Sequence, residues 1–238
     1  MAASIPHSAL PTLEARNRYV DGARAVLPLA AVIGVLGVVL GYSARVAGFS
    51  TLATAVMSAT TFAGGAQFAA IAVLQSGGTV AAAVATAVAL NARYALMAAT
   101  LAPSAGDRLL DRLLVSHLTV DESWAVAYAD DGRFSRERLI GAGLVLLVVH
   151  VTTTALGAAA GPSLGDPRAL GLDAALPALF LLLVWPRLRD RDDAFAAFSG
   201  AAMALALTPI APAGIPVLGA AAAAFVRAPG RSKDNTLS

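Results

Sequence analysis

The sequence predicts an all-α protein, a polytopic bundle of about seven or eight transmembrane helices, and three observations lead to this class. First, 58% of the 238 residues are apolar and only 13% are charged, about half the charged fraction of a typical soluble domain. Second, the apolar residues form long continuous runs, unlike the alternating pattern of a membrane β-barrel. Third, a few polar residues lie inside these runs, where hydrocarbon makes them costly and a functional role is the default interpretation.

The apolar runs have the lengths of membrane spans. A transmembrane helix needs about 20 apolar residues, with a range of about 17–25. Candidate spans lie at 25–42, 51–75, 79–102, 139–160, 169–185, 194–207 and 213–226, and a shorter one lies at 113–129. We therefore expect one membrane domain over 25–227, between a polar cytoplasmic N-terminal tail at 1–24 and a polar C-terminal tail at 228–238.

Positive charge orients membrane proteins, because Lys and Arg concentrate in cytoplasmic loops. If all eight segments cross and the N-terminus is inside, twelve of the 17 Lys and Arg residues are cytoplasmic and four are outside, with Arg93 inside a span. A seven-span arrangement with the N-terminus outside, in which 113–129 does not cross, gives the same split. We favour eight spans because an Arg cluster before the first span usually stays inside.

The composition also narrows the chemistry. The chain has no cysteine, and its three histidines lack metal-ligand spacing, so we expect no disulfide, metal site or cofactor. The net charge of +2 is too small to indicate a nucleic-acid partner. The polar residues inside the apolar runs indicate a protein that moves a polar substrate, and two alternatives to this interpretation stay open. One is an intramembrane enzyme that uses His150 with Asp121 and Glu122, and the other is a non-transporting membrane scaffold whose charged residues lie at the surface.

The second run, 51–75, is expected to be a broken helix. Gly64 and Gly65 each weaken a helix by about 1 kcal/mol relative to Ala, and Gln67 supplies a side-chain amide beside them. A break at membrane depth exposes backbone groups and helix dipoles, with which transporters hold substrate carboxylates and amines. The alternative is a close helix crossing, which is the role that we expect for Gly37 and Gly41 in the first run.

The third run, 79–102, contains Asn91 and Arg93. If the run is one helix, Arg93 lies about 13 Å from its C-terminal end, so we expect a buried acidic partner. Asp121 and Glu122 are the first choices. A structural ion pair and a contact to a substrate carboxylate are both consistent with this pattern.

The short segment 113–129 holds two acidic residues. If it is one helix, His117, Asp121 and Trp124 share a face. A carboxylate held among apolar groups can exchange a proton near neutral pH, so Asp121 and Glu122 are candidates for proton coupling. The alternative is a surface segment with solvated acids. His150, in the middle of the run 139–160, is a further candidate, although a satisfied core histidine is the commoner interpretation.

Four segments, in this order, resemble the AzlC family of branched-chain amino acid permeases. They are FAGGAQF at 62–68, NARY at 91–94, LTVDESW at 118–124 and GLDAALPALF at 171–180, and the likeness extends over residues 28–225. Family members are the large subunits of exporters for leucine, isoleucine, valine and similar amino acids, and many work with a small membrane subunit of the AzlD type. The resemblance implies a secondary transporter, not an enzyme, in the bacterial cytoplasmic membrane, with that subunit, the lipid bilayer and an amino acid as partners.

A zwitterionic substrate needs a contact for its anion and one for its cation at the same time. We expect the carboxylate at the broken helix or at Arg93, the ammonium at an acid or at Asn91, and the apolar side chain against an aromatic ring, for which Phe68 is a further choice. The substrate-binding candidates are Phe62, Gly64, Gly65, Gln67, Asn91, Arg93 and Trp124, and the proton-coupling candidates are Asp121, Glu122 and His150.

Overall fold

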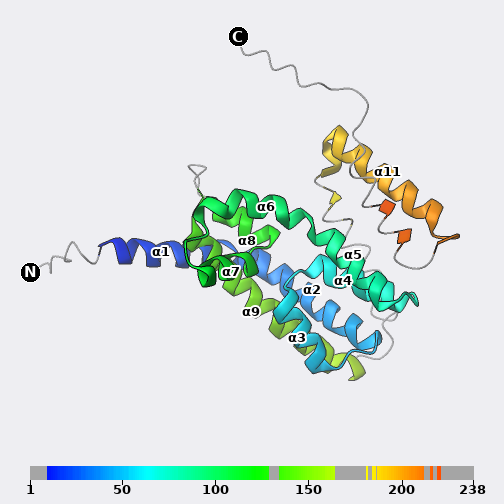
Figure 1. The fold of residues 1–238 in the computed structure, drawn as a ribbon. Coiled ribbons are helices and arrows are strands. Elements are labelled where there is room, and N and C mark those ends of the chain that lie inside the picture. Colours follow the sequence, from blue (N-terminus) through cyan, green and yellow to red (C-terminus); the bar gives the residue numbers. More distant parts are fainter. Residues whose placement is uncertain are drawn as a thin grey trace, which may run out of the picture. The chain divides into compact units, whose positions relative to one another are not determined.

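The structure, a computed structural model, describes residues 10–128, 134–163, 181, 184–185, 187–211, 215–216 and 219–220. Within these residues the regular structure is helical (Figure 1), apart from one isolated bridge between Tyr128 and Phe134, so the expected all-α class is confirmed. The α-helices are α1 (Leu10–Ala25), α2 (Leu27–Val46), α3 (Thr51–Thr61), α4 (Gly64–Gln75), α5 (Val80–Asn91), α6 (Arg93–Leu101), α7 (Leu109–His117), α8 (Asp121–Ala127), α9 (Arg136–Ala160) and α11 (Arg191–Leu207). Short 3₁₀ helices lie at Ala102–Ser104, Gly161–Ser163 and Arg187–Arg189.

The chain forms two compact units, which we describe separately. The first contains residues 1–67 and 91–165, and the second contains residues 68–90 and 166–238. In the second unit, α11 begins at Asp190, whose carboxylate accepts hydrogen bonds from the backbone N–H groups of Asp192 and Asp193. Most of the expected spans at 169–185 and 213–226 lies outside the described residues.

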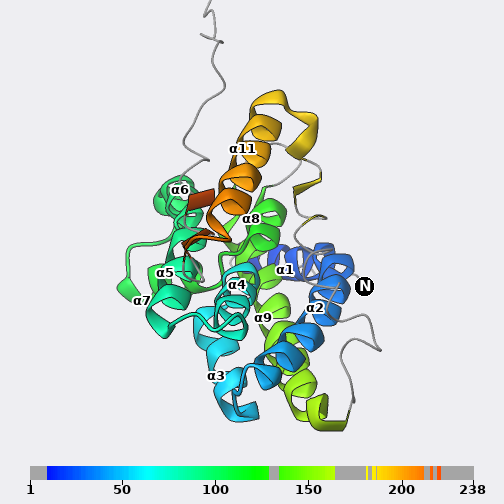
Figure 2. The ribbon, with the colours of Figure 1, turned by 90° about the vertical axis from the view of Figure 1, so that its right-hand side faces the viewer.

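The first unit is built on the packing of α2 against α9, which lie side by side in both views (Figures 1 and 2). Glycines bring the two backbones together. A Cβ atom at Gly41 would lie 2.6 Å from the backbone nitrogen of Ala158, and Gly157 faces the backbone of Val38 in the same way. The close crossing expected at Gly37 and Gly41 is therefore confirmed, because only a residue without a side chain leaves room for it.

Two of the described helices, α2 and α9, are long and apolar enough to cross a membrane, each with a mean hydropathy of 2.1. Both also present large apolar side chains outward: Val35 is 66% exposed, Val148 59% and Leu156 64%. A lipid environment covers such side chains at no cost. The number of spans stays a prediction, because length and composition alone identify these two helices.

The segment expected as a polar N-terminal tail contains α1. This helix packs against the first turns of α9, where Gly22 faces the backbone of Arg138 and Gly141 faces the backbone of Tyr19. The part of α1 around Tyr19 and Gly22 therefore belongs to the helical packing of the first unit.

Three expected spans are each interrupted. The expected break of the second run is present, but it lies at Phe62 and Ala63, just before the glycine pair. The third run is not one helix as expected, since Ala92 separates α5 from α6. The expectation of one helix through 113–129 is also wrong, because residues 118–120 separate α7 from α8, so His117 does not share a helix face with Asp121 and Trp124.

The helices that flank the first two interruptions are too short to cross a bilayer alone. They have 11, 12, 12 and 9 residues. At about 1.5 Å per residue each reaches about 18 Å or less, against about 30 Å of hydrocarbon. Taken together, α3 with α4 and α5 with α6 each have the length of one span.

Candidate functional site

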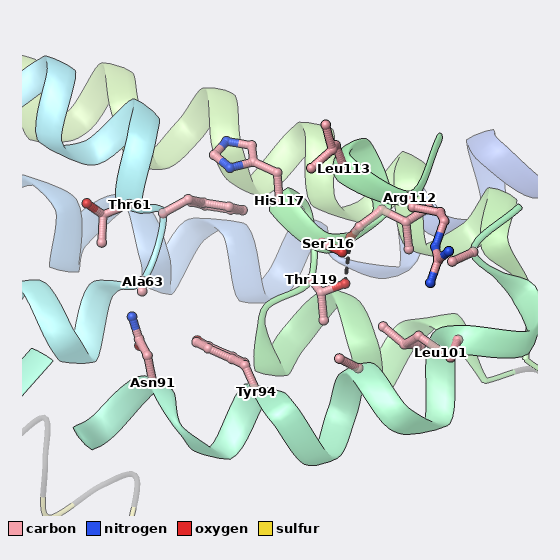
Figure 3. Close-up of a pocket in the computed structure, with 15 residues that line it drawn as sticks. Thr61, Ala63, Asn91, Tyr94, Leu101, Arg112, Leu113, Ser116, His117 and Thr119 are labelled. Atoms are coloured by element: carbon pink, nitrogen blue, oxygen red, sulfur yellow. Dashed lines mark hydrogen bonds between the residues drawn. The ribbon is translucent and has the colours of Figure 1, made fainter. Parts of the chain in front are cut away.

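The three interruptions meet at one cavity in the first unit (Figure 3). Its volume is approximately 470 Å³, within the range of about 300–1,000 Å³ that is usual for small-molecule sites. Apolar residues such as Phe62, Leu101 and Leu113 form much of the wall. The polar side chains in the wall are Thr61, Asn91, Tyr94, Arg112, Ser116, His117 and Thr119.

At the first interruption, Phe62 ends α3 with a left-handed backbone (φ 37°, ψ 51°). Its N–H donates to the carbonyl of Ser58 at 3.2 Å, which is the hydrogen bond of a left-handed helix cap. Glycine is the usual residue in this conformation, because a Cβ atom makes it costly. Among the described residues, Phe62 is the non-glycine residue with a positive φ.

Gln67 joins the two halves of the broken helix to α9. Its amide nitrogen donates to the carbonyl of Met57 at 3.0 Å, and its amide oxygen lies 2.9 Å from Nε2 of His150. The Met57 carbonyl only accepts, so the amide nitrogen must face it and the amide oxygen must face His150. Nε2 of His150 therefore carries a hydrogen and donates it. Gln67 is 2% exposed and His150 5%.

Phe62 contacts both the cavity and this buried polar pair. Its ring centroid lies 5.8 Å from that of His150 and 6.1 Å from that of His117, both within the usual range for aromatic contacts. His117 lines the cavity, whereas His150 does not belong to its lining. The Phe62 ring thus contacts one histidine that lines the cavity and one that does not.

The second interruption supplies Asn91 and Tyr94. Ala92 keeps helical angles (φ −56°, ψ −27°), and its carbonyl accepts from the N–H of Ala95 at 3.1 Å, a tighter turn than that of an α-helix. Figure 3 shows the Asn91 amide directed toward Ala63 and the Tyr94 ring beside it, facing the cavity. The Arg93 side chain lies outside the described residues, and so does its expected pairing with an acid.

Hydroxyl groups satisfy the backbone of the third interruption. Thr119 donates through Oγ1 to the carbonyl of Val115 at 2.6 Å. Oγ of Ser123 accepts from the N–H of Val120 at 2.9 Å and donates to the carbonyl of Leu118 at 2.7 Å. Ser123 is fully buried. These bonds explain why the helix can stop here, since buried backbone groups must find partners.

Arg112 is the cavity-lining residue that carries a permanent charge. Figure 3 places it toward one end of the cavity, away from Asn91. The neighbouring Asp111 is held by Arg136 in an ion pair of 2.9 Å. From the sequence alone, Arg112 is expected only as one of the four positive charges outside the membrane. The signal that could have found it is its position one helical turn before Ser116 and His117.

The other predicted site residues lie outside the lining of this cavity. Gly64 and Gly65 are in the first turn of α4. Asp121 and Glu122 are half-buried at the start of α8, where negative charge suits a helix N-terminus. Trp124 donates through Nε1 to Oγ1 of Thr100 at 3.0 Å. Phe68 is 2% exposed and belongs to the second unit.

Of the residues predicted from the sequence, Phe62 and Asn91 therefore line the cavity, and Gln67 and His150 form a pair behind Phe62. Gln67 and His150 are separate candidates in the sequence, which contains no sign that they meet. The lining residues that were not predicted from the sequence are Thr61, Tyr94, Arg112, Ser116, His117 and Thr119.

A comparison with protein families finds a match between residues 28–164 and the family model described as AzlC protein. This segment is more than half of the chain and contains all three interruptions. Three of the four segments noted in the sequence lie inside it, and the fourth, at 171–180, lies outside it and outside the described residues. No curated protein and no solved structure matches the chain.

Proposed function

The chain belongs to the AzlC family, which is associated with branched-chain amino acid transport, and from this premise we propose that it exports leucine, isoleucine and valine across the cytoplasmic membrane. The observation that supports this proposal best is the meeting of three helix interruptions at one cavity. Interrupted helices beside a cavity are how membrane transporters place polar backbone and side-chain groups around a substrate.

The wall of the cavity suits a small apolar amino acid. Arg112 provides a fixed cation for the carboxylate, and the oxygen atoms of Asn91 and Thr61 at the other end can accept hydrogen bonds from the ammonium group. The rings and branched side chains between them, including Phe62 and Leu101, provide the apolar surface that a branched side chain requires.

In the proposed arrangement the chain crosses the membrane several times, with α2 and α9 as two of the spans and the pairs α3–α4 and α5–α6 as broken spans. The outward-facing valine and leucine side chains of α2 and α9 support contact with lipid. We propose eight crossings with both termini cytoplasmic, and a small subunit of the AzlD type as partner. The number of crossings and the side of the termini rest on the charge pattern, and the small subunit rests on the family.

Proton coupling is also part of the proposal. Asp121 and Glu122 are half-buried at the start of α8, and His150 is buried against Gln67. Each is a group that can take up or release a proton. His150 is favoured, because its donor contact to Gln67 links it directly to the broken helix.

The function is tested by a toxic leucine analogue. Cells that lack their own leucine exporters should become resistant when this chain and its small subunit are expressed together, because exported analogue no longer accumulates. The measurement is intracellular analogue, with cells that express the small subunit alone as the control. Unchanged accumulation, with both subunits detected in the membrane, contradicts the proposed function.

A further inference from the structure

Phe62 belongs to two environments at once. It lines the cavity, and its ring contacts both the cavity residue His117 and the buried His150. His150 is in turn bonded to Gln67 at 2.9 Å. The Phe62 ring therefore touches both the cavity and one member of the buried pair at the first interruption.

The backbone of Phe62 is strained to hold the ring there. With φ of 37° it adopts a conformation that costs a residue with a Cβ atom about 1–2 kcal/mol. The ring is 5% exposed and packs in a cluster with Val120 of the third interruption and Leu146 of α9. Strained residues of this kind persist where the surroundings hold them, and they gather at binding sites and switches.

We propose that the Phe62 ring is the barrier between the substrate cavity and the buried Gln67–His150 pair, and that it links occupation of the cavity to exposure of the pair. A substrate side chain in the cavity packs against the same ring that covers His150, so displacement of the ring by substrate opens the pair. A proton-coupled transporter needs such a barrier, since a continuous water path would let protons cross independently of the substrate. The link to transport rests on the proposed function, whereas the barrier itself does not.

The chain is suited to a chemical test of the barrier because it contains no cysteine. The reporter is Gly64→Cys: a Cβ atom at Gly64 would lie 3.8 Å from Cε1 of His150, which is ordinary contact, so the new thiol sits beside the buried pair. The matched control is Gly65→Cys, where a Cβ atom would meet no described atom within 4 Å. The measurement is the rate at which a small, charged thiol reagent labels each cysteine in proteoliposomes.

Three changes at Phe62 separate the ring from the backbone. Phe62→Ala removes the ring and keeps the strain, Phe62→Gly removes both, and Phe62→Leu keeps apolar bulk. We expect Gly64→Cys to react slowly when Phe62 is present. With alanine or glycine at position 62 it should react about tenfold faster or more, because the reagent then reaches the thiol without a prior displacement of the ring. Beside leucine the rate should stay near the native one. The Gly65→Cys rate should change little throughout.

Two results overturn the barrier. One is equal labelling of Gly64→Cys with every residue at position 62. The other is an equal rise at Gly64→Cys and Gly65→Cys, which indicates local unfolding in place of an opened path. Leucine transport by the native chain is measured in parallel. If the protein transports no leucine but shows the expected labelling, the result supports the barrier and contradicts only the proposed function.

Discussion

Replacing Gln67 with leucine is expected to abolish transport and to lower the free energy of unfolding by about 1–3 kcal/mol, the cost of leaving a buried donor without a partner. The donor is Nε2–H of His150, which gives its hydrogen bond to the Gln67 amide in a region where both residues are at most 5% exposed. Leucine is close to glutamine in size, so the loss reports the missing hydrogen bonds and not a cavity. The measurement is a denaturant titration in detergent beside a transport assay.

The double variant Gln67→Leu with His150→Leu separates stability from function. It removes the donor together with its acceptor, so we expect much of the lost stability to return, because replacing both partners by apolar groups is nearly neutral. Transport should stay absent. If the double variant transports leucine at the native rate, the pair is only structural.

Replacing Arg112 with alanine is expected to raise the KM for leucine about 10–100-fold, the loss expected for one charge-assisted hydrogen bond of about 1.5–3 kcal/mol. Arg112 is the permanently charged residue in the cavity wall, and the substrate carboxylate is its expected partner. Arg112→Lys should raise the KM less, since lysine keeps the charge and removes only the bidentate geometry.

Arg108→Ala is the matched control, because Arg108 lies one turn earlier at the start of α7 and makes no side-chain cap. It should leave the KM unchanged. Leucinamide, which lacks the carboxylate, should inhibit leucine transport weakly, and equally so in the native protein and in Arg112→Ala. Equal effects of the two arginine changes on leucine transport would exclude Arg112 as the carboxylate contact.

Composition and the length of the apolar runs were sufficient for the helical class and for the position of α9 (Arg136–Ala160), which covers the expected span at 139–160. The broken second run was also predictable. The break lies at Phe62, however, since the cap bond to Ser58 and the Gln67 bond to Met57 fix its place. A glycine pair indicates that a helix can end nearby, and the hydrogen bonds of the folded chain determine the residue at which it ends.

The third interruption could not be predicted from apolar pattern alone. A helix through 113–129 is plausible by hydropathy, but Ser123 and Thr119 offer the backbone other partners. Such local hydrogen bonds from side chains compete with helix formation, and a hydropathy profile does not reveal them. The pairing of Gln67 with His150, 83 residues apart, likewise depends on tertiary packing, in which α3 lies beside α9.

Protection of a cavity cysteine by substrate is the most direct test of the central claim, that this cavity binds the transported amino acid. The cysteine is placed at Ser116, which lines the cavity, and the control is Leu110→Cys, on the same helix and 78% exposed. In proteoliposomes that also contain a cysteine-free small subunit, leucine should slow the labelling of Ser116→Cys in a saturable manner and leave Leu110→Cys unaffected, whereas lysine should protect neither. If leucine is transported and the labelling of Ser116→Cys stays unchanged at saturating leucine, the substrate binds elsewhere and the claim is contradicted.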